Sequence, residues 1–180
     1  MTRETSVSDN RAAGDGGGLF LREWATEYQP VDVPLVSRNL AFGDGGGMHV
    51  ETGTIRAVEV RDNLALGDGG GVWSSGTWSL GWSVVTGNVA SGDGGGVWSS
   101  GAATLEWVEV AHNRSMSGDG GGVFNVGDLD AATSSVAAND ARTGSGGGVF
   151  TTGPMALDRV RVIDNSASTW SGRGGAVDRR

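Results

Sequence analysis

LEWVEVAHNRSMSGDGGGVF, residues 105–124, contains the pattern that decides the fold of this chain. Val108 and Val110 precede Asn113 by five and three residues. Residues that alternate by two share one face of a β-strand, so the two valines share a face and the residues between them point the other way. The three consecutive glycines that follow predict a sharp turn, because each would cost about 1 kcal/mol relative to Ala in a helix.

The same pattern occurs seven times along the chain. The spacing between its asparagines ranges from 24 residues, between Asn39 and Asn63, to 29 residues, between Asn10 and Asn39. A period in the twenties is typical of stacked coils in a solenoid. A valine stands three residues before each asparagine: Val7, Val36, Val60, Val85, Val110, Val136 and Val162. We therefore expect an all-β solenoid of about seven coils with a continuous internal valine column.

Glycine makes up 34 of the 180 residues, whereas only 3 residues are proline and 37% are hydrophobic. Collagen is excluded, because its triple helix needs a glycine at every third position and these glycines come in blocks. The recurring valines and the seven tryptophans also argue against a disordered glycine-rich linker. The composition therefore favours an ordered repeat protein.

The formal net charge is −8 and the chain has no cysteine. Such a surface repels a phosphate backbone, so no nucleic-acid partner is expected. No stretch reaches the roughly 18 apolar residues of a membrane span, and the first ten residues do not resemble a signal peptide. Because both chain ends cut through a coil, we expect residues 1–180 to be a single β-helix domain from a longer protein whose caps are missing. Its uncapped coils are candidates for end-to-end association.

The phrase N-x-A-x-G-D-G-G-G-V-W, followed by G-x-x-x-L-x-x-V-x-V-x-x-N, resembles the repeat of right-handed parallel β-helix proteins of the pectin-lyase-like superfamily. It is most similar to the GGA(I)/FxxN repeats of polymorphic outer-membrane and autotransporter-like proteins. The resemblance covers nearly the whole chain, and the coil that contains Pro30 and Pro34 fits least well. It implies an extracellular or outer-membrane location. The competing fold is a leucine-rich repeat, although Ala or Ser stands where that family needs a large apolar residue.

The asparagine column is best interpreted as structural, because stacked side-chain amides can bond one another and satisfy turn backbone. Its members include Asn39, Asn63, Asn88, Asn113, Asn139 and Asn165. A second column carries carboxylates that would lie about 4.8 Å apart and repel one another. Either they extend into solvent or calcium lies between them, which makes calcium the one cofactor to consider. The candidate ligands are Asp44, Asp68, Asp93 and Asp119, and the column is interrupted at Ser145 and Arg173.

Two sets of aromatic residues are candidate binding positions. One set follows the glycines and includes Trp73 and Trp98. These rings form an exposed strip, stack on one another, or face inward while the neighbouring valines are exposed, because the sequence does not fix the parity of a strand across a glycine turn. The other consists of Trp82 and Trp107, each six residues before its asparagine and opposite in parity to the core valines. Glu59 and Glu109 lie on the same outward face, with Arg159 and Arg161 beside them. Flat rings next to charged groups suit sugar rings or a protein partner. The alternative is a structural role, in which the two indoles stack on one another across neighbouring strands beneath a loop.

No catalytic motif is evident. Glu59 and Glu109 should lie two coils apart, about 10 Å, at the edge of the roughly 6.5–9.5 Å separation of an inverting glycosidase pair. The GDGGG stretch lacks the lysine and the helix of a phosphate-binding loop. The sequence therefore predicts a non-catalytic structural or adhesive β-helix segment of a secreted or cell-surface bacterial protein. The alternative is a polysaccharide-binding or polysaccharide-degrading β-helix.

Overall fold

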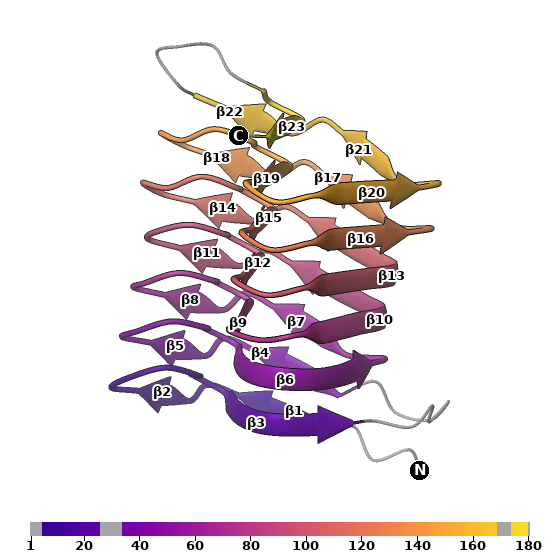
Figure 1. The fold of residues 1–180 in the computed structure, drawn as a ribbon. Coiled ribbons are helices and arrows are strands. Elements are labelled where there is room, and N and C mark those ends of the chain that lie inside the picture. Colours follow the sequence, from indigo (N-terminus) through magenta and orange to yellow (C-terminus); the bar gives the residue numbers. More distant parts are fainter. Residues whose placement is uncertain (1–4, 26–33, 169–173, 180) are drawn as a thin grey trace.

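The computed structural model describes residues 5–25, 34–168 and 174–179. In these ranges the regular structure consists of parallel strands, which form one sheet of sixteen strands and one of seven. Seven copies of the repeat stack into a solenoid of about six turns (Figure 1). The predicted parallel β-helix is confirmed. The leucine-rich alternative is wrong, because within residues 5–25, 34–168 and 174–179 the segments that return the chain to the next coil are strands and turns without a helix.

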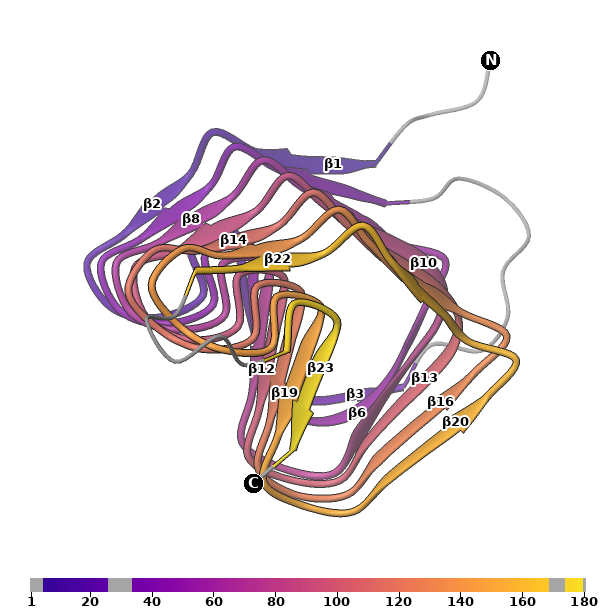
Figure 2. The ribbon, with the colours of Figure 1, turned by 90° about the horizontal axis from the view of Figure 1, so that it is seen from above.

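Each coil has four faces, which are visible in the view down the stack (Figure 2). The first face follows the glycines and consists of β3 (Leu19–Ala25), β6 (Met48–Arg56), β9 (Val72–Ser74), β12 (Val97–Ser99), β15 (Val123–Asn125), β19 (Val149–Thr151) and β23 (Val177–Arg179). The second face contains the end of β6, the first halves of β10 (Trp78–Thr86) and β13 (Ala103–Ala111), then β16 (Leu129–Ala132) and β20 (Met155–Asp158).

The third face contains the second halves of β10 and β13, together with β1 (Ser6–Ser8), β4 (Leu35–Ser37), β7 (Glu59–Arg61), β17 (Ser135–Ala137) and β21 (Arg161–Ile163). The fourth face is the seven-stranded sheet of β2 (Arg11–Ala12), β5 (Leu40–Ala41), β8 (Leu64–Ala65), β11 (Val89–Ala90), β14 (Arg114–Ser115), β18 (Asp140–Ala141) and β22 (Ser166–Ala167). The coils therefore carry one or two more strand segments than the two or three that the sequence pattern indicates. No described segment is a helix able to cross a membrane.

The valine column is the centre of the core, as predicted. Val60, Val85 and Val110 are paired in register from coil to coil and are almost fully buried. Each buried valine side chain contributes roughly 1.5–3 kcal/mol relative to an exposed one. Because the valine recurs at each third-face strand, the same contribution is repeated along the stack.

The three glycines of each turn have separate structural reasons. Gly94 has a φ of +63°, which is the left-handed region that residues with a Cβ avoid. Gly95 and Gly96 lie against the next coil. A Cβ on Gly96 would approach the carbonyl oxygen of Gly122 to 2.7 Å and the amide nitrogen of Asn113 to 2.8 Å. The glycine cluster therefore allows the tight turn at Gly94, and it allows the backbones of successive coils to lie close together at Gly95 and Gly96.

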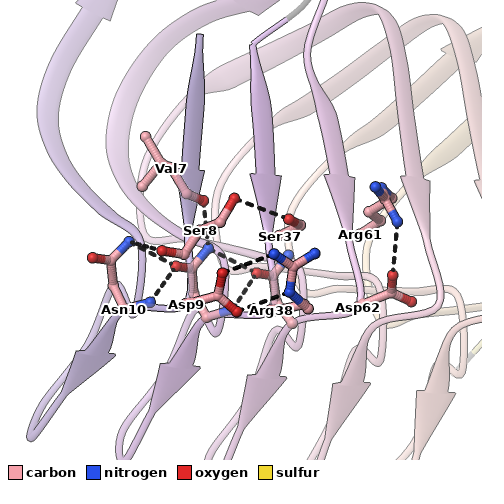
Figure 3. A network of polar contacts seen from close by, with 10 residues as sticks. Val7, Ser8, Asp9, Asn10, Ser37, Arg38, Arg61 and Asp62 are labelled. Atoms are coloured by element: carbon pink, nitrogen blue, oxygen red, sulfur yellow. Dashed lines mark hydrogen bonds and ion pairs between the residues drawn. The ribbon is translucent and has the colours of Figure 1, made fainter. Parts of the chain in front are cut away.

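The asparagine column forms a buried ladder, which confirms the structural interpretation. The Nδ2 atom of Asn88 donates to Asn113 Oδ1 at 3.0 Å and to the Val60 carbonyl at 2.9 Å. The backbone N–H of Asn88 donates to the same Oδ1 atom. Figure 3 shows the first step of the ladder at Asn10, next to the ion pair between Asp9 and Arg38.

One detail of the described coils, at Gly53, differs from the simple repeat. Gly53, which the pattern places at the end of a strand, lies inside the nine-residue strand β6. It is opposite Trp78, the largest fully buried side chain, whose Nε1 atom donates to Ser99 Oγ at 3.1 Å. Gly53 has a φ of +131°, a backbone conformation that residues with a Cβ rarely adopt. The irregular coil around Pro30 lies outside the described residues.

Candidate functional site

The second and third faces meet at a corner where one residue in each of five coils has a positive φ. We call this set the outer corner; it consists of Ala57, Trp82, Trp107, Thr133 and Arg159, with φ between 45° and 57°. The left-handed conformation costs roughly 1–2 kcal/mol for a residue with a Cβ, and it is exceptional for a bulky side chain. Trp82 and Trp107 are therefore unusual residues for this position.

Serine side chains fasten the backbone at this corner. Ser83 Oγ donates to the carbonyl of Gly81 at 2.7 Å, across Trp82, and accepts the backbone N–H of Val58 at 3.2 Å. Ser134 Oγ makes the same bonds, to the carbonyl of Ala132 and from the N–H of Val108. Both serines are buried, so the sequence alternates Val and Ser at this core position for a structural reason. These hydrogen bonds hold the strained corner in place.

Both corner indoles are exposed, as predicted, with 43% of Trp82 and 52% of Trp107 accessible to solvent. Their surroundings differ. The guanidinium of Arg56, from the preceding coil, lies over the Trp82 ring at 5.0 Å, which is a cation–π contact. The residue that corresponds to Arg56 one coil later is Gly81, which has no side chain. Trp107 therefore receives no such cation from the coil before it.

A groove of about 380 Å³ lies next to Trp107. It exists because one coil carries small residues where its neighbours carry large ones: Thr133 and Ser135 lie in register between Trp107 and Glu109 on one side and Arg159 and Arg161 on the other. The floor is formed by Thr133, Ser135 and the backbone near Val108 and Ser134. The structure thus brings Trp107, Glu109 and the two predicted arginines together around one groove.

The charged groups that line this groove differ in whether they form an ion pair. Arg159 makes an ion pair with Asp158 at 3.0 Å, and both side chains are largely exposed. Glu109 and Arg161 make no ion pair within the part of the chain that the structure describes. Because they lie in one column with only Ser135 between them, they are two coils apart, about 10 Å. The groove therefore presents an unpaired carboxylate on one wall and an unpaired guanidinium on the other.

On the opposite side of the outer corner is a smaller hollow of about 300 Å³. Its lining includes the carboxylates of Glu106, Asp130 and Asp158 and the partly exposed side chain of Leu157. Thus the corner separates an acidic second face from a third face that carries Arg159 and Arg161.

Glu59 and Glu109 occupy the positions that the sequence predicts. Both are in register with Val84, so they lie two coils apart with the Val84 side chain between them. Glu59 is held by Arg61, whose Nε atom is 2.9 Å from Glu59 Oε1. Glu59 does not line the groove at Trp107. The geometry places these two glutamates in separate surroundings, rather than as a facing pair.

Trp73 and Trp98 belong to a different surface, the outer side of the first face. Their rings stack at 4.9 Å with an interplanar angle of 1°. The stack continues through Phe20, His49, Phe124 and Phe150, so the self-stacking interpretation of this column is confirmed. The adjacent valines point inward. Since the broad ring faces are used within the stack, Trp73 and Trp98 are less available to a ligand than Trp107.

Among the described residues, His49 is the one imidazole ring in this stack. It lies 4.2 Å from Phe20 and 4.4 Å from Trp73, and its side chain is 8% exposed. Its Nδ1 atom is 3.7 Å from Asp15 Oδ2, beyond hydrogen-bond reach, and is unpartnered. Burial lowers the pKa of His49, and the charge of Asp15 opposes that effect. The imidazole is therefore held mainly in its neutral form at neutral pH.

The aspartate column forms a second ladder, made of side chain and backbone. Asp44, Asp68 and Asp93 each accept the backbone N–H of the next aspartate through Oδ1, at distances of 2.8, 2.8 and 2.6 Å. Asp119 accepts the N–H of Ser145 in the same way. Burial raises the pKa of Asp68 and Asp93, and these backbone hydrogen bonds act in the opposite direction.

This ladder gives the aspartates a structural role that needs no cation. Among residues 5–25, 34–168 and 174–179, no cluster of three or more His, Asp or Glu side chains has the arrangement of a metal site. Calcium binding by Asp44, Asp68, Asp93 and Asp119 stays a prediction that titration can test. The interruption at Arg173 lies outside the described residues.

The sequence indicates Trp107, Glu109 and the arginines, but it gives no sign of the groove between them. Thr133 and Ser135 carry no motif, and their importance comes from being smaller than the residues one coil above and below. That relation becomes visible only when segments 26 residues apart are aligned in register, as Ser134 and Val108 are.

Comparison with family models, with curated proteins and with solved structures finds no match for this chain.

Proposed function

We propose that this chain is a non-catalytic, adhesive β-helix segment of a secreted or cell-surface protein, and that the groove lined by Trp107 is its ligand-binding surface. The observation that carries the proposal is the presence of a large exposed indole, Trp107, at a position with positive φ beside that groove. A glycine would suit that backbone without strain, and the other described coils use Ala, Trp, Thr or Arg there. Strained residues cluster at functional sites, where a role other than folding retains them.

The rest of the molecule supports a scaffold. The asparagine, valine and glycine columns are accounted for by hydrogen bonding and packing between coils. The outer corner and the third face next to it are among the columns that change from coil to coil, as is the column of residues before each ladder asparagine. A rigid stack that varies only at its surface is suited to presenting a binding site. The similarity of the repeat phrase to those of polymorphic outer-membrane and autotransporter-like proteins supports an extracellular location.

Carbohydrate is the first ligand class to test, because an exposed indole provides a flat apolar platform with a polar edge. A glycan array should be probed with the wild-type chain, with Trp107→Ala and with Trp73→Ala as the matched control. Trp73 is also a tryptophan of the repeat, but its ring is stacked within the first face. We expect binding that Trp107→Ala loses and Trp73→Ala retains. Identical profiles for the three proteins would refute a role for the corner in glycan binding.

A polysaccharide lyase or hydrolase is the competing proposal. It would use Glu109, the unpaired carboxylate of the groove wall. Its test is the release of unsaturated or reducing products from acidic polysaccharides by the wild-type chain, compared with Glu109→Gln. Product release that is lost in Glu109→Gln would establish an enzyme and overturn the adhesive proposal.

A further inference from the structure

We propose that the groove at Trp107 binds a phosphocholine group, with the quaternary ammonium at Trp107 and Glu109 and the phosphate at Arg159 and Arg161. This inference rests on the proposed function, because it names the ligand class of the same groove. Phosphocholine carries a permanent cation and an anion a few bonds apart. The groove carries complementary charges on its two walls.

The cationic half is supported by a comparison between adjacent coils. At Trp82 the chain itself supplies a cation, since the Arg56 guanidinium lies 5.0 Å from the ring centre. At Trp107 the corresponding residue is Gly81, so the chain supplies none. Trp107 is also the more exposed of the two indoles, and Glu109 beside it has no ion-pair partner among the described residues. The face of an indole attracts a quaternary ammonium, and a neighbouring carboxylate adds an opposite charge.

The anionic half is supported by the opposite wall. Arg159 and Arg161 come from the same coil and both line the groove. Guanidinium groups bind phosphate through paired N–H donors, and the hydroxyls of Thr133 and Ser135 on the floor add further donors. Arg161 has no ion pair within the described part of the chain, so a phosphate would not need to displace a carboxylate from it.

The charge arrangement selects against simpler ligands. An anion without a cation would bind at the arginines but meet the unpaired carboxylate of Glu109. A cation without an anion would bind at Trp107 but meet the two guanidinium groups. The backbones of the two walls are two coils, about 10 Å, apart. A group that carries both charges can interact with both walls at once.

The test is calorimetric titration of the full chain with O-phosphocholine at low ionic strength, with choline chloride and inorganic phosphate as separate comparison ligands. We expect saturable binding of phosphocholine, and binding at least about tenfold weaker for each half alone, because each half uses one wall only. Trp107→Ala and Arg161→Gln should each weaken phosphocholine binding by about tenfold or more. Trp82→Ala is the matched control and should bind like the wild type. Melting curves of every variant verify that it is folded.

Absence of saturable phosphocholine binding, or equal binding by wild type, Trp107→Ala and Arg161→Gln, would overturn the inference. So would a loss in Trp82→Ala as large as that in Trp107→Ala. If the glycan array shows Trp107-dependent binding while phosphocholine gives no heat, the proposed function holds and only this ligand assignment fails.

Co-sedimentation with phosphatidylcholine vesicles, compared with phosphatidylglycerol vesicles, then identifies the source of the group. Trp107-dependent binding to phosphatidylcholine vesicles would support the inference and assign the group to a lipid surface. Binding of free phosphocholine without vesicle binding would support it with a soluble or polymer-attached source.

Discussion

The asparagine ladder and the outer corner are each built from one residue per coil, yet they differ in burial and in how much the residue type varies between coils. Asn113 is buried and bonded to the coils on both sides, and each copy of the repeat has the same residue there. The outer corner is exposed and its residue differs between most coils. We infer that the residue type is the same in each copy of the repeat where the side chain must form hydrogen bonds with both neighbouring coils. A position that projects from the stack is free to serve another purpose.

The largest effect is expected from Asn113→Ala. This change removes the acceptor for two donors of Asn88 and the donor to the Val85 carbonyl, all of them buried. Each unsatisfied buried group costs about 1–3 kcal/mol, so we expect a loss of roughly 3–5 kcal/mol in the free energy of unfolding. The melting temperature should fall by about 10 °C or more. His112→Ala, one residue earlier and exposed, is the control and should have little effect.

Gly96→Ala should be the next most damaging change. The added Cβ would lie 2.7 Å from the Gly122 carbonyl oxygen and 2.8 Å from the ladder amide of Asn113, and neither can move without disturbing the stack. Overpacking of this kind costs about 1–3 kcal/mol, which chemical denaturation can measure. Gly81→Ala is the matched change at the outer corner. A Cβ on Gly81 would lie 3.5 Å from Arg56 Cγ and 3.6 Å from the Glu106 carbonyl oxygen, which are ordinary contacts. A loss of stability in Gly81→Ala as large as that in Gly96→Ala would show that the two regions do not differ in this way.

A gain in stability is expected from Asp93→Asn at neutral pH. Burial raises the pKa of Asp93, so this carboxyl group favours folding below its unfolded pKa of about 3.8 and that contribution is lost as pH rises through the folded value. Asparagine keeps an Oδ1 acceptor for the Asp119 N–H but carries no charge. We expect a small rise in the melting temperature at pH 7 that disappears near pH 3. If calcium binds this column, Asp93→Asn would instead weaken calcium-dependent stabilisation in calorimetric melts.

The smallest expected effect is a pH dependence from His49. Because burial lowers its folded pKa, the stability that the neutral imidazole contributes is complete above the unfolded pKa of about 6.5 and is lost as pH falls through the folded value. Melting curves between pH 7 and pH 5 should show this loss in the wild type. His49→Phe keeps a ring between Phe20 and Trp73 and should flatten the profile over that range. An unchanged profile in His49→Phe would assign the dependence to other groups.

The sequence predicts the valine, asparagine and glycine columns well, because each of these residue types has a local structural preference. Alternation of valines, asparagine at a turn and consecutive glycines each have a direct physical meaning, and together they predict the strands, the ladder and the stacking direction. The inward direction of the valines next to Trp73 and Trp98 could not be predicted, because the parity of a strand is lost across a glycine turn.

The corner is poorly predicted because it leaves no local signal. The segment of β13 around Trp107 has the pattern of an uninterrupted strand, yet its φ of 57° turns the chain there and places Glu106 and Trp107 both outward. Nor does the sequence show that the buried hydroxyls of Ser83 and Ser134 form the hydrogen bonds that stabilise this corner. Their importance follows from contacts with segments about one coil away, at Val58 and Val108.

The most direct test of this account is the melting temperature of Trp107→Gly, measured beside that of Asn113→Ala. Glycine relieves a left-handed strain of roughly 1–2 kcal/mol, which offsets the loss of the partly buried indole surface and the greater backbone freedom of glycine. We predict a melting temperature within about 3 °C of the wild type, because the net change should be below about 1 kcal/mol. A fall as large as that of Asn113→Ala would contradict the account, since it would make Trp107 part of the framework that holds the coils together.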